Sequence, residues 1–245
     1  MFIFNLFFLS KLLFIKNIKG VDNSLFTETI TLQLDIIKSL NLTQKVNIDF
    51  SEKYSSINNN TYINNLYFSN SQFRKVRLTN FVSENKQMFN SVWYPSYEYD
   101  APILSIHLVN YGKNKLGKDR AMCFVNLVEI EKNKYTQPFI ELKQNYPELN
   151  ENNIKPLLPY EKYLNDAMLY AHIYDFNKFQ TILPEALKTY FAIYLNTFQK
   201  TTDIDLVKEK HIEYNNFRAK TDLHFMPKDF FEPEWYSAMI QDYYK

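Results

Sequence analysis

NSVWYPSYEYDAPILSIHLVNY, which runs from Asn90 to Tyr111, is the segment around which the rest of the chain is organised. It predicts one strand over Met88–Tyr94, a turn held by Pro95 and Pro102, and a second strand over 103–109. The connections to the neighbouring strands are short and polar, so we expect consecutive strands to pair antiparallel.

The second of these strands has two different faces, because successive side chains in a strand point to opposite sides. Leu104, Ile106 and Leu108 form a purely apolar face. The other face carries Ile103, Ser105, His107 and Val109. A hydroxyl and an imidazole in the middle of a buried face need partners, which are side chains, water or a ligand. His107 is therefore either a hydrogen-bonded core histidine or part of a binding site.

The rest of the chain supplies further strands and helices. We expect strands over 73–82 and 121–130, mostly loop over 43–65, and helix or extended packing over 160–174. Expected helices cover 22–40 with Ser24 as cap, 137–146, a segment starting at Pro184, a segment capped by Asp203 or Asp205 that ends at Asp222, and 230–244. Helices before and after an antiparallel meander predict an α+β domain in which helices cover the sheet.

Composition excludes several classes of protein. The chain has 245 residues, 46% of them apolar, which suits a folded domain. Its 3 glycines cannot build a glycine-rich phosphate loop. A net charge of +1 argues against a strongly basic nucleic-acid binder.

Metal and disulfide chemistry have little basis in the sequence. Cys123 is the single cysteine, so no disulfide can form within the chain and we expect a buried core thiol. The 4 histidines show no H-x-x-x-H spacing, so we expect no zinc site.

Residues 1–22 form an N-terminal extension to a single domain over 23–245. Its apolar run precedes its lysines, which is the reverse of a secretory signal. The extension is an unstructured or mis-assigned start, a targeting segment, or an amphipathic helix on a membrane surface. The abundance of Asn, Lys, Ile, Phe and Tyr indicates an AT-rich genome, as in an organelle or a phage.

Six short motifs carry a resemblance to a known family. They are FRKVR (73–77), NSVWYP (90–95), YDAPIL (99–104), LPEA (183–186), YNNFRAKTD (214–222) and FEPEW (231–235). In their order and spacing, the chain resembles the ferredoxin-dependent bilin reductases from Ser24 to its C-terminus. Within the family it is most similar to members that reduce the 15,16 double bond.

The resemblance implies a fold and a reaction. It implies a three-layer α/β/α sandwich with biliverdin between the central antiparallel sheet and the C-terminal helices. Electrons come from reduced ferredoxin, and the protein holds no cofactor or metal of its own. The implied reaction converts biliverdin IXα to 15,16-dihydrobiliverdin in phycobilin (phycoerythrobilin) biosynthesis. The alternatives are another regiospecificity, or a bilin-binding handover protein without catalysis.

The resemblance also implies partners and a location. The partners are biliverdin and ferredoxin, with the next bilin reductase or heme oxygenase as further candidates. We expect a monomer in the plastid stroma, or alternatively in the cytoplasm of a cyanobacterium or a phage-infected cell.

Two residues are candidates for catalysis. Asp222 matches the family's C-terminal catalytic aspartate, although an aspartate four residues after Arg218 could equally be a helix-terminal ion pair. His107 stands where the family normally has an aspartate. A histidine can donate a proton, and as a cation it would suit the substrate's propionates. The expected substrate-binding residues are Asn90, Thr79, Asn126, Arg218 and Lys220.

Basic residues gather on the first predicted strand and in a loop near it. They are Arg74, Lys75, Arg77, Lys113, Lys115 and Lys118. They are either a solvated sheet edge or a surface for acidic ferredoxin, with propionate contacts from those that point inward. Asp100 is expected to be a turn residue.

Overall fold

The structure is a computed structural model that describes residues 25–46, 49–55, 60–113, 117, 119–131, 134–150, 160–222 and 226–245. The predicted N-terminal extension lies outside these residues, as do Ser24, Lys115, Lys118 and His224.

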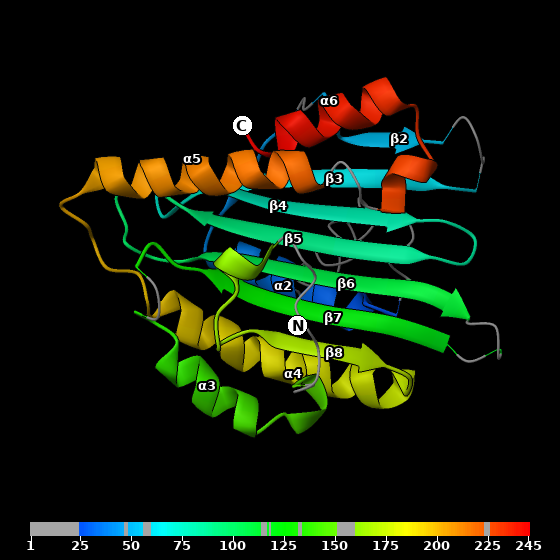
Figure 1. Ribbon diagram of the computed structural model, residues 1–245, viewed down its shortest axis with the longest axis horizontal. Helices are drawn as coiled ribbons and strands as arrows, with labels where there is room; N and C mark the ends of the chain where they lie inside the picture. Colours follow the sequence, from blue (N-terminus) through cyan, green and yellow to red (C-terminus); the bar gives the residue numbers. More distant parts are fainter. Residues whose placement is uncertain are drawn as a thin grey trace, which may run out of the picture.

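One antiparallel sheet forms the middle layer of the molecule (Figure 1). Within the described residues it contains 8 strands in the order β1-β3-β4-β5-β6-β7-β8, and β2 pairs with β3. The strands are β1 (Thr43–Gln44), β2 (Glu52–Tyr54), β3 (Tyr62–Ser69), β4 (Phe73–Val82), β5 (Gln87–Pro95), β6 (Ile103–Lys113), β7 (Asp119–Val128) and β8 (Leu169–Ile173). The sheet runs as a meander from β3 to β7, as the short connections predict.

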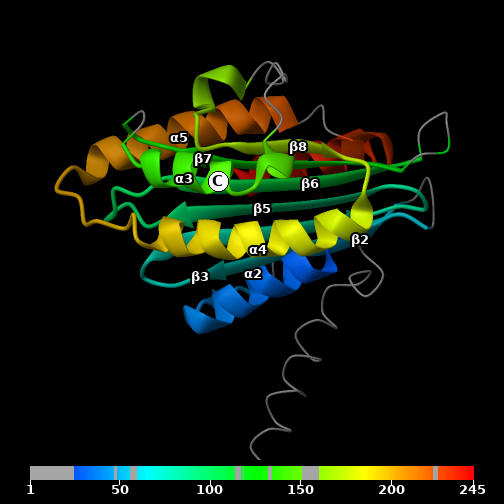
Figure 2. The ribbon, with the colours of Figure 1, turned by 90° about the horizontal axis from the view of Figure 1, so that it is seen from below.

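Helices cover both faces of the sheet, so the predicted three-layer α/β/α sandwich is confirmed (Figure 2). One face carries α2 (Thr27–Ser39), α3 (Gln137–Gln144) and α4 (Phe176–Leu195), and the other carries α5 (Ile204–Thr221) and α6 (Pro233–Tyr243). Short 3-10 helices occupy Pro147–Leu149, Tyr160–Tyr163 and Met226–Asp229. Among the described helices, none is long and apolar enough to cross a membrane.

The larger core lies between the sheet and α2, α3 and α4. Leu104, Ile106 and Leu108 are buried in it, which confirms the predicted apolar face of β6. Trp93 anchors this layer: its ring meets the ring of Phe191 edge to face at 4.9 Å, and its Nε1 donates to Oε1 of Gln33 at 3.2 Å. Burial of such large side chains is the main source of stability of the sandwich.

The opposite face of the sheet holds one continuous row of residues that is polar from β3 to β6 and aromatic in β7 and β8. Strand register places Asn65, Thr79, Asn90, His107, Phe124 and Tyr170 side by side across six strands. This row crosses the sheet on the side of α5 and α6, so the polar face of β6 belongs to a larger polar strip.

The prediction of loop over 43–65 is wrong, since β1, β2 and the start of β3 lie there. Polar residues hid β3, because Asn64 and Asn65 are strand residues whose side chains donate to main-chain carbonyls of Ser51 and Phe50. Tertiary pairing therefore overrides a local sequence that is typical of loops.

Helix boundaries were predicted with mixed success. Pro184 does not start a helix but lies inside α4, which begins at Phe176 after its cap residue Asp175. Asp203 caps α5 by accepting from the N–H of Leu206 at 3.0 Å, as predicted. The segment 160–174 resolves into a 3-10 helix followed by β8, and α6 begins three residues later than expected.

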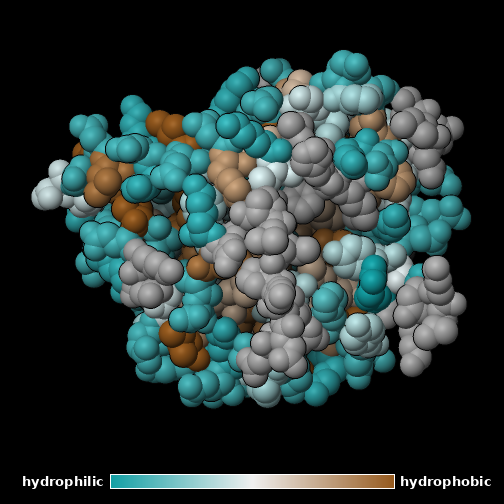
Figure 3. Space-filling view, viewed as in Figure 1, coloured by the Kyte–Doolittle hydropathy of each residue, from teal (hydrophilic) through white to brown (hydrophobic). Residues whose placement is uncertain are grey.

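On the face shown in Figure 3, most of the coloured side chains are hydrophilic, with apolar ones scattered among them. Several of the exposed apolar residues lie on α5, namely Ile204, Leu206 and Ile212.

Candidate functional site

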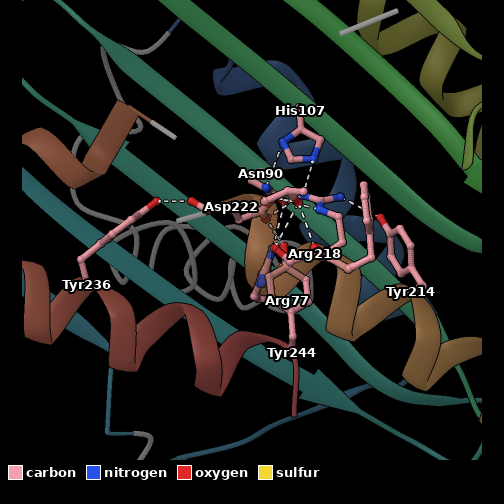
Figure 4. A network of polar contacts seen from close by, with 10 residues as sticks. Arg77, Asn90, His107, Tyr214, Arg218, Asp222, Tyr236 and Tyr244 are labelled. Atoms are coloured by element: carbon pink, nitrogen blue, oxygen red, sulfur yellow. Dashed lines mark hydrogen bonds and ion pairs between the residues drawn. The ribbon is translucent and has the colours of Figure 1, made fainter. Parts of the chain in front are cut away.

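A buried polar cluster joins the sheet to the two C-terminal helices (Figure 4). His107 of β6 and Asn90 of β5 face Arg218 from α5, and Asp222 follows that helix directly as its C-cap. β4 contributes Arg77, and the C-cap of α6 contributes Tyr244.

His107 is held between two hydrogen-bond donors. Its Nδ1 lies 3.0 Å from Nδ2 of Asn90, and its Nε2 lies 3.1 Å from Nη2 of Arg218. A neutral imidazole carries one N–H and can accept at only one nitrogen. The Asn90 amide could be turned so that its oxygen faces His107. Its NH₂ group would then face Arg77, another donor, whose Nη2 lies 3.3 Å from the present position of Oδ1 of Asn90. Whichever way the Asn90 amide is turned, these contacts therefore place one pair of hydrogen-bond donors against each other.

The imidazole of His107 is neutral at physiological pH. Burial lowers its pKa to about 3, and the positive charges of Arg218 and Arg77 act in the same direction while Asp222 opposes them. The cation expected from the sequence is therefore not the form present in this structure. His107 is placed to accept hydrogen bonds.

Asp222 is a buried carboxylate, with 3% of its surface exposed. It accepts a two-pronged ion pair from Arg218, at 3.0 Å from Nε and 2.8 Å from Nη2, and a further hydrogen bond from the hydroxyl of Tyr244. Burial favours its neutral form, but Arg218 and Tyr244 outweigh burial and hold the pKa of Asp222 below its ordinary value. The predicted ion pair between Arg218 and Asp222 at the end of the helix is therefore present, and it lies inside the cluster that contains the other candidate catalytic residue, His107.

Two buried arginines face this single carboxylate. Arg77 is fully buried, with its guanidinium stacked on the rings of Tyr243 at 4.1 Å and Tyr244 at 5.2 Å. Arg218 also donates to the hydroxyl of Tyr214 at 2.7 Å. Because His107 is neutral, the charged groups of the cluster drawn in Figure 4 sum to one net positive charge. Such a site stabilises an anionic ligand or a negative charge that develops during a reaction.

Apolar and aromatic side chains continue the sheet surface beside His107. Val109, Met122 and Tyr170 form a small buried cluster, and Phe124 packs against it and against the His107 ring at 5.8 Å. A flat apolar surface next to a few convergent polar groups is typical of sites for planar ligands.

A small cavity adjoins the cluster between the sheet and α6. It has a volume of about 20 Å³ and is lined by Arg77, Thr79, Asn90 and Asp222 together with apolar residues. This volume is large enough for a single water molecule.

Four of the residues predicted to form the site are brought together, namely Asn90, His107, Arg218 and Asp222. Thr79 lies next to Asn90 in the strand register and donates to Oδ1 of Asn65 at 2.8 Å.

The other two predicted substrate-binding residues lie apart from the cluster. Asn126 donates to the main-chain carbonyl of Tyr163 at 2.8 Å and so fastens the segment before β8. Lys220 is exposed on α5, because two residues along a helix from Arg218 leads to a different face.

The interpretation of Arg74, Lys75 and Arg77 as a solvated sheet edge is wrong. Their strand, β4, is flanked by β3 and β5, so Arg77 is buried under the helices. Lys113 is exposed, and the other loop lysines lie outside the described residues.

Sequence patterns did not indicate that Tyr236 and Tyr244 belong to the cluster. Tyr236 and Tyr244 reach Asp222 only because α6 packs beside the end of α5, whereas Tyr214 and Arg218 lie four residues apart on α5 itself. Asp100 forms an ion pair with Lys134, which agrees with its predicted turn role. In the part of the chain that the structure describes, no group of three His, Cys, Asp or Glu side chains could hold a metal ion.

Comparison with known proteins places these features in context. The sequence model of the family described as ferredoxin-dependent bilin reductase matches residues 34–243. Two similar relatives are named 15,16-dihydrobiliverdin:ferredoxin oxidoreductase. The one from Nostoc punctiforme is 27% identical over 72% of this chain and 75% of its own length. The one from Prochlorococcus marinus strain MIT 9211 is 30% identical over 70% and 75%.

A solved structure has a similar fold. It is phytochromobilin synthase from tomato in complex with biliverdin, which superposes with a TM-score of 0.75 at 15% identity and covers 89% of this chain and 82% of the synthase.

Proposed function

We propose a substrate and a reaction for this chain on the premise that it belongs to the ferredoxin-dependent bilin reductases, whose family model spans residues 34–243. It is thus an oxidoreductase that reduces a bilin with electrons from ferredoxin. The proposed substrate is biliverdin IXα, and the proposed product is 15,16-dihydrobiliverdin.

One observation in particular supports reduction at the polar cluster. Arg77 and Arg218 are buried with Asp222 as the carboxylate of the cluster, so the site is preorganised for additional negative charge. Ferredoxin delivers one electron at a time, and each electron makes a bilin more negative. Fixed positive charges in a site of low dielectric stabilise that state.

The substrate is inferred from the shape of the site and from the tomato synthase. Biliverdin is planar and carries two propionates, which suits an apolar surface beside excess positive charge. The related fold of phytochromobilin synthase holds biliverdin. We place the bilin on the apolar surface around Phe124, with His107, Arg218 and Asp222 together at one edge of it.

The double bond is inferred from the relatives. Those from Nostoc and Prochlorococcus are named for 15,16-dihydrobiliverdin. Asn90 agrees with this assignment, because phycocyanobilin-forming members of the family carry a histidine at the matching position. The product would pass to the next bilin reductase, and the AT-rich composition supports a plastid as the compartment.

An anaerobic assay with biliverdin and a ferredoxin-reducing system tests the proposal. We expect stoichiometric binding with a shift of the bilin absorbance, followed by uptake of two electrons and two protons and a single product on chromatography. Absence of a spectral shift at micromolar protein would remove biliverdin as the substrate. A shift without reduction would instead identify a bilin-binding handover protein.

A further inference from the structure

A cationic surface cleft lies between strands β3 and β4 and the C-terminal end of α6. It has a volume of about 250 Å³, and its lining includes Lys45, Tyr67, Arg74, Lys75, Asp242 and Lys245. Lys75 is one of the cations that line this cleft. The Nζ atom of Lys75 donates to the carbonyls of Asp242 at 3.3 Å and Tyr243 at 2.7 Å, and it lies 5.0 Å from the centre of the Tyr67 ring.

Behind this cleft are two buried hydroxyls without a protein partner. Within the described residues, the hydroxyls of Tyr67 and Tyr94 make no hydrogen bond, although the side chains are 5% and 0% exposed. Nε and Nη1 of Arg77 are also buried and also make no hydrogen bond within the described residues. Buried polar groups are almost always paired, and water is the partner small enough to reach these atoms.

These groups follow one another from the cleft to the polar cluster. Tyr67 lines the cleft and lies opposite Arg77 in the strand register, and Tyr94 of β5 lies opposite Lys75. The Arg77 guanidinium lies 5.2 Å from the centre of the Tyr244 ring, and the Tyr244 hydroxyl donates directly to Asp222. The series therefore joins a solvent-filled cleft to a buried carboxylate.

The resting cluster holds no acid suited to protonating a bilin. Arg218 and Tyr244 keep Asp222 ionised, and His107 is neutral. Reduction of one double bond consumes two protons, so both must reach the cluster from outside.

We propose that Lys75, Tyr67, Tyr94 and Tyr244 form a proton relay, with water between them, that carries protons from the cleft to Asp222. This inference rests on the proposed bilin reduction. After each electron arrives from ferredoxin, the Asp222 carboxylate takes a proton from the Tyr244 hydroxyl and passes it to the bilin. Each hydroxyl gives one proton and takes another, so every O–H bond that breaks is replaced. Two cycles supply two protons from solvent and match the two electrons.

The environment of Lys75 suits it to the entry position. Burial and the positive charge of Arg77 together lower the pKa of Lys75 to about 7, although Asp242 acts in the opposite direction. Arg74 on the same strand and Lys45 near β1 also face it and lower the pKa. A lysine with this pKa both binds and releases a proton near neutral pH.

The test uses Tyr94→Phe and Tyr67→Phe, each of which removes a hydroxyl without a protein partner. Their folding free energy should be unchanged or slightly higher, so any loss of rate is not a loss of fold. Tyr190→Phe is the matched control, because that tyrosine is fully buried on α4 and donates to the carbonyl of Ala167 on the other side of the sheet.

Single-turnover reduction of bound biliverdin is followed in H₂O and D₂O by absorbance and by spin resonance of the bilin radical. We expect the radical to form at the wild-type rate in both relay variants. Its decay should slow roughly tenfold or more, with a larger solvent isotope effect, because a proton donor has been cut off from solvent. Tyr190→Phe should match the wild type.

Radical decay at the wild-type rate and isotope effect in both variants would overturn the relay while leaving bilin reduction intact. Slower formation of the radical would also overturn it, since the tyrosines would then serve electron transfer. A wild-type protein that forms neither radical nor reduced bilin would instead contradict the proposed function.

Discussion

Asp222→Asn is expected to slow bilin reduction by about 10²–10⁴-fold, the usual effect of losing a general acid. Asparagine keeps the size of the side chain and can still accept from Tyr244, but it cannot pass a proton to the bilin. Biliverdin binding should remain, since the apolar surface around Phe124 and both buried arginines are unchanged. The measurements are the binding titration and the single-turnover rate, made on the same preparation.

Loss of the ion pair also has a cost in stability, which must be separated from the catalytic effect. Removing one partner of a buried pair leaves Arg218 uncompensated and destabilises by about 3–5 kcal/mol. Asp205→Asn is the control, because Asp205 lies exposed at the start of the same helix. Full reduction by folded Asp222→Asn would end the case for Asp222 as a proton donor.

The stabilising effect of Asp222 depends on pH in a defined direction. Its pKa is lower in the folded state than the value of about 3.9 typical of unfolded chains. Its contribution to the free energy of unfolding is therefore complete above about pH 4 and is lost as the pH falls through the folded-state pKa. Thermal unfolding of wild type and Asp222→Asn should accordingly converge in acid.

The sequence predicted those features that follow from the spacing of apolar residues within one strand or one helix. The alternation in β6 was sufficient to place His107 opposite the core formed by Leu104, Ile106 and Leu108, and the helical stripe ending at Asp222 was also readable. These features follow from the 2.0 and 3.6 residue periods of strand and helix.

Contacts between distant segments were not readable in the same way. Arg77 was known only as one of three cations on a strand, and its burial depends on β3 and β5 lying on either side of it. Tyr244 stands 22 residues after Asp222, so its hydrogen bond exists only because α6 packs back over the sheet. A sequence contains the residues of such a cluster but not the register that assembles it.

His107→Asp is expected to raise the rate of reduction and to keep or raise thermal stability. The two oxygens of a carboxyl group can accept from Asn90 and Arg218 whether or not the group is protonated, so the surplus donor around the imidazole disappears. A core histidine of purely structural value would behave differently, because an unpaired buried carboxyl would destabilise the fold.

The gain in rate follows from a second carboxyl beside Asp222. His107 and Asp222 already influence each other's ionisation across Arg218, so two carboxylates at these positions would repel each other. Repulsion and burial raise the pKa of one of them, and that carboxyl then keeps a proton at neutral pH. One carboxyl of the variant would thus already be protonated before the electron arrives, whereas in the wild type that proton must first reach the cluster from solvent.

His107→Gln is the matched comparison, since glutamine fills similar space and accepts at one atom but has no titratable proton. We expect the rate to follow the order Asp, His, Gln at position 107, with roughly tenfold or more between Asp and Gln. Because the stored proton does not come from solvent during turnover, His107→Asp should also lessen the effect of Tyr94→Phe in the double variant. Lower stability together with lower rate in His107→Asp would show that the imidazole is the better partner for Arg218.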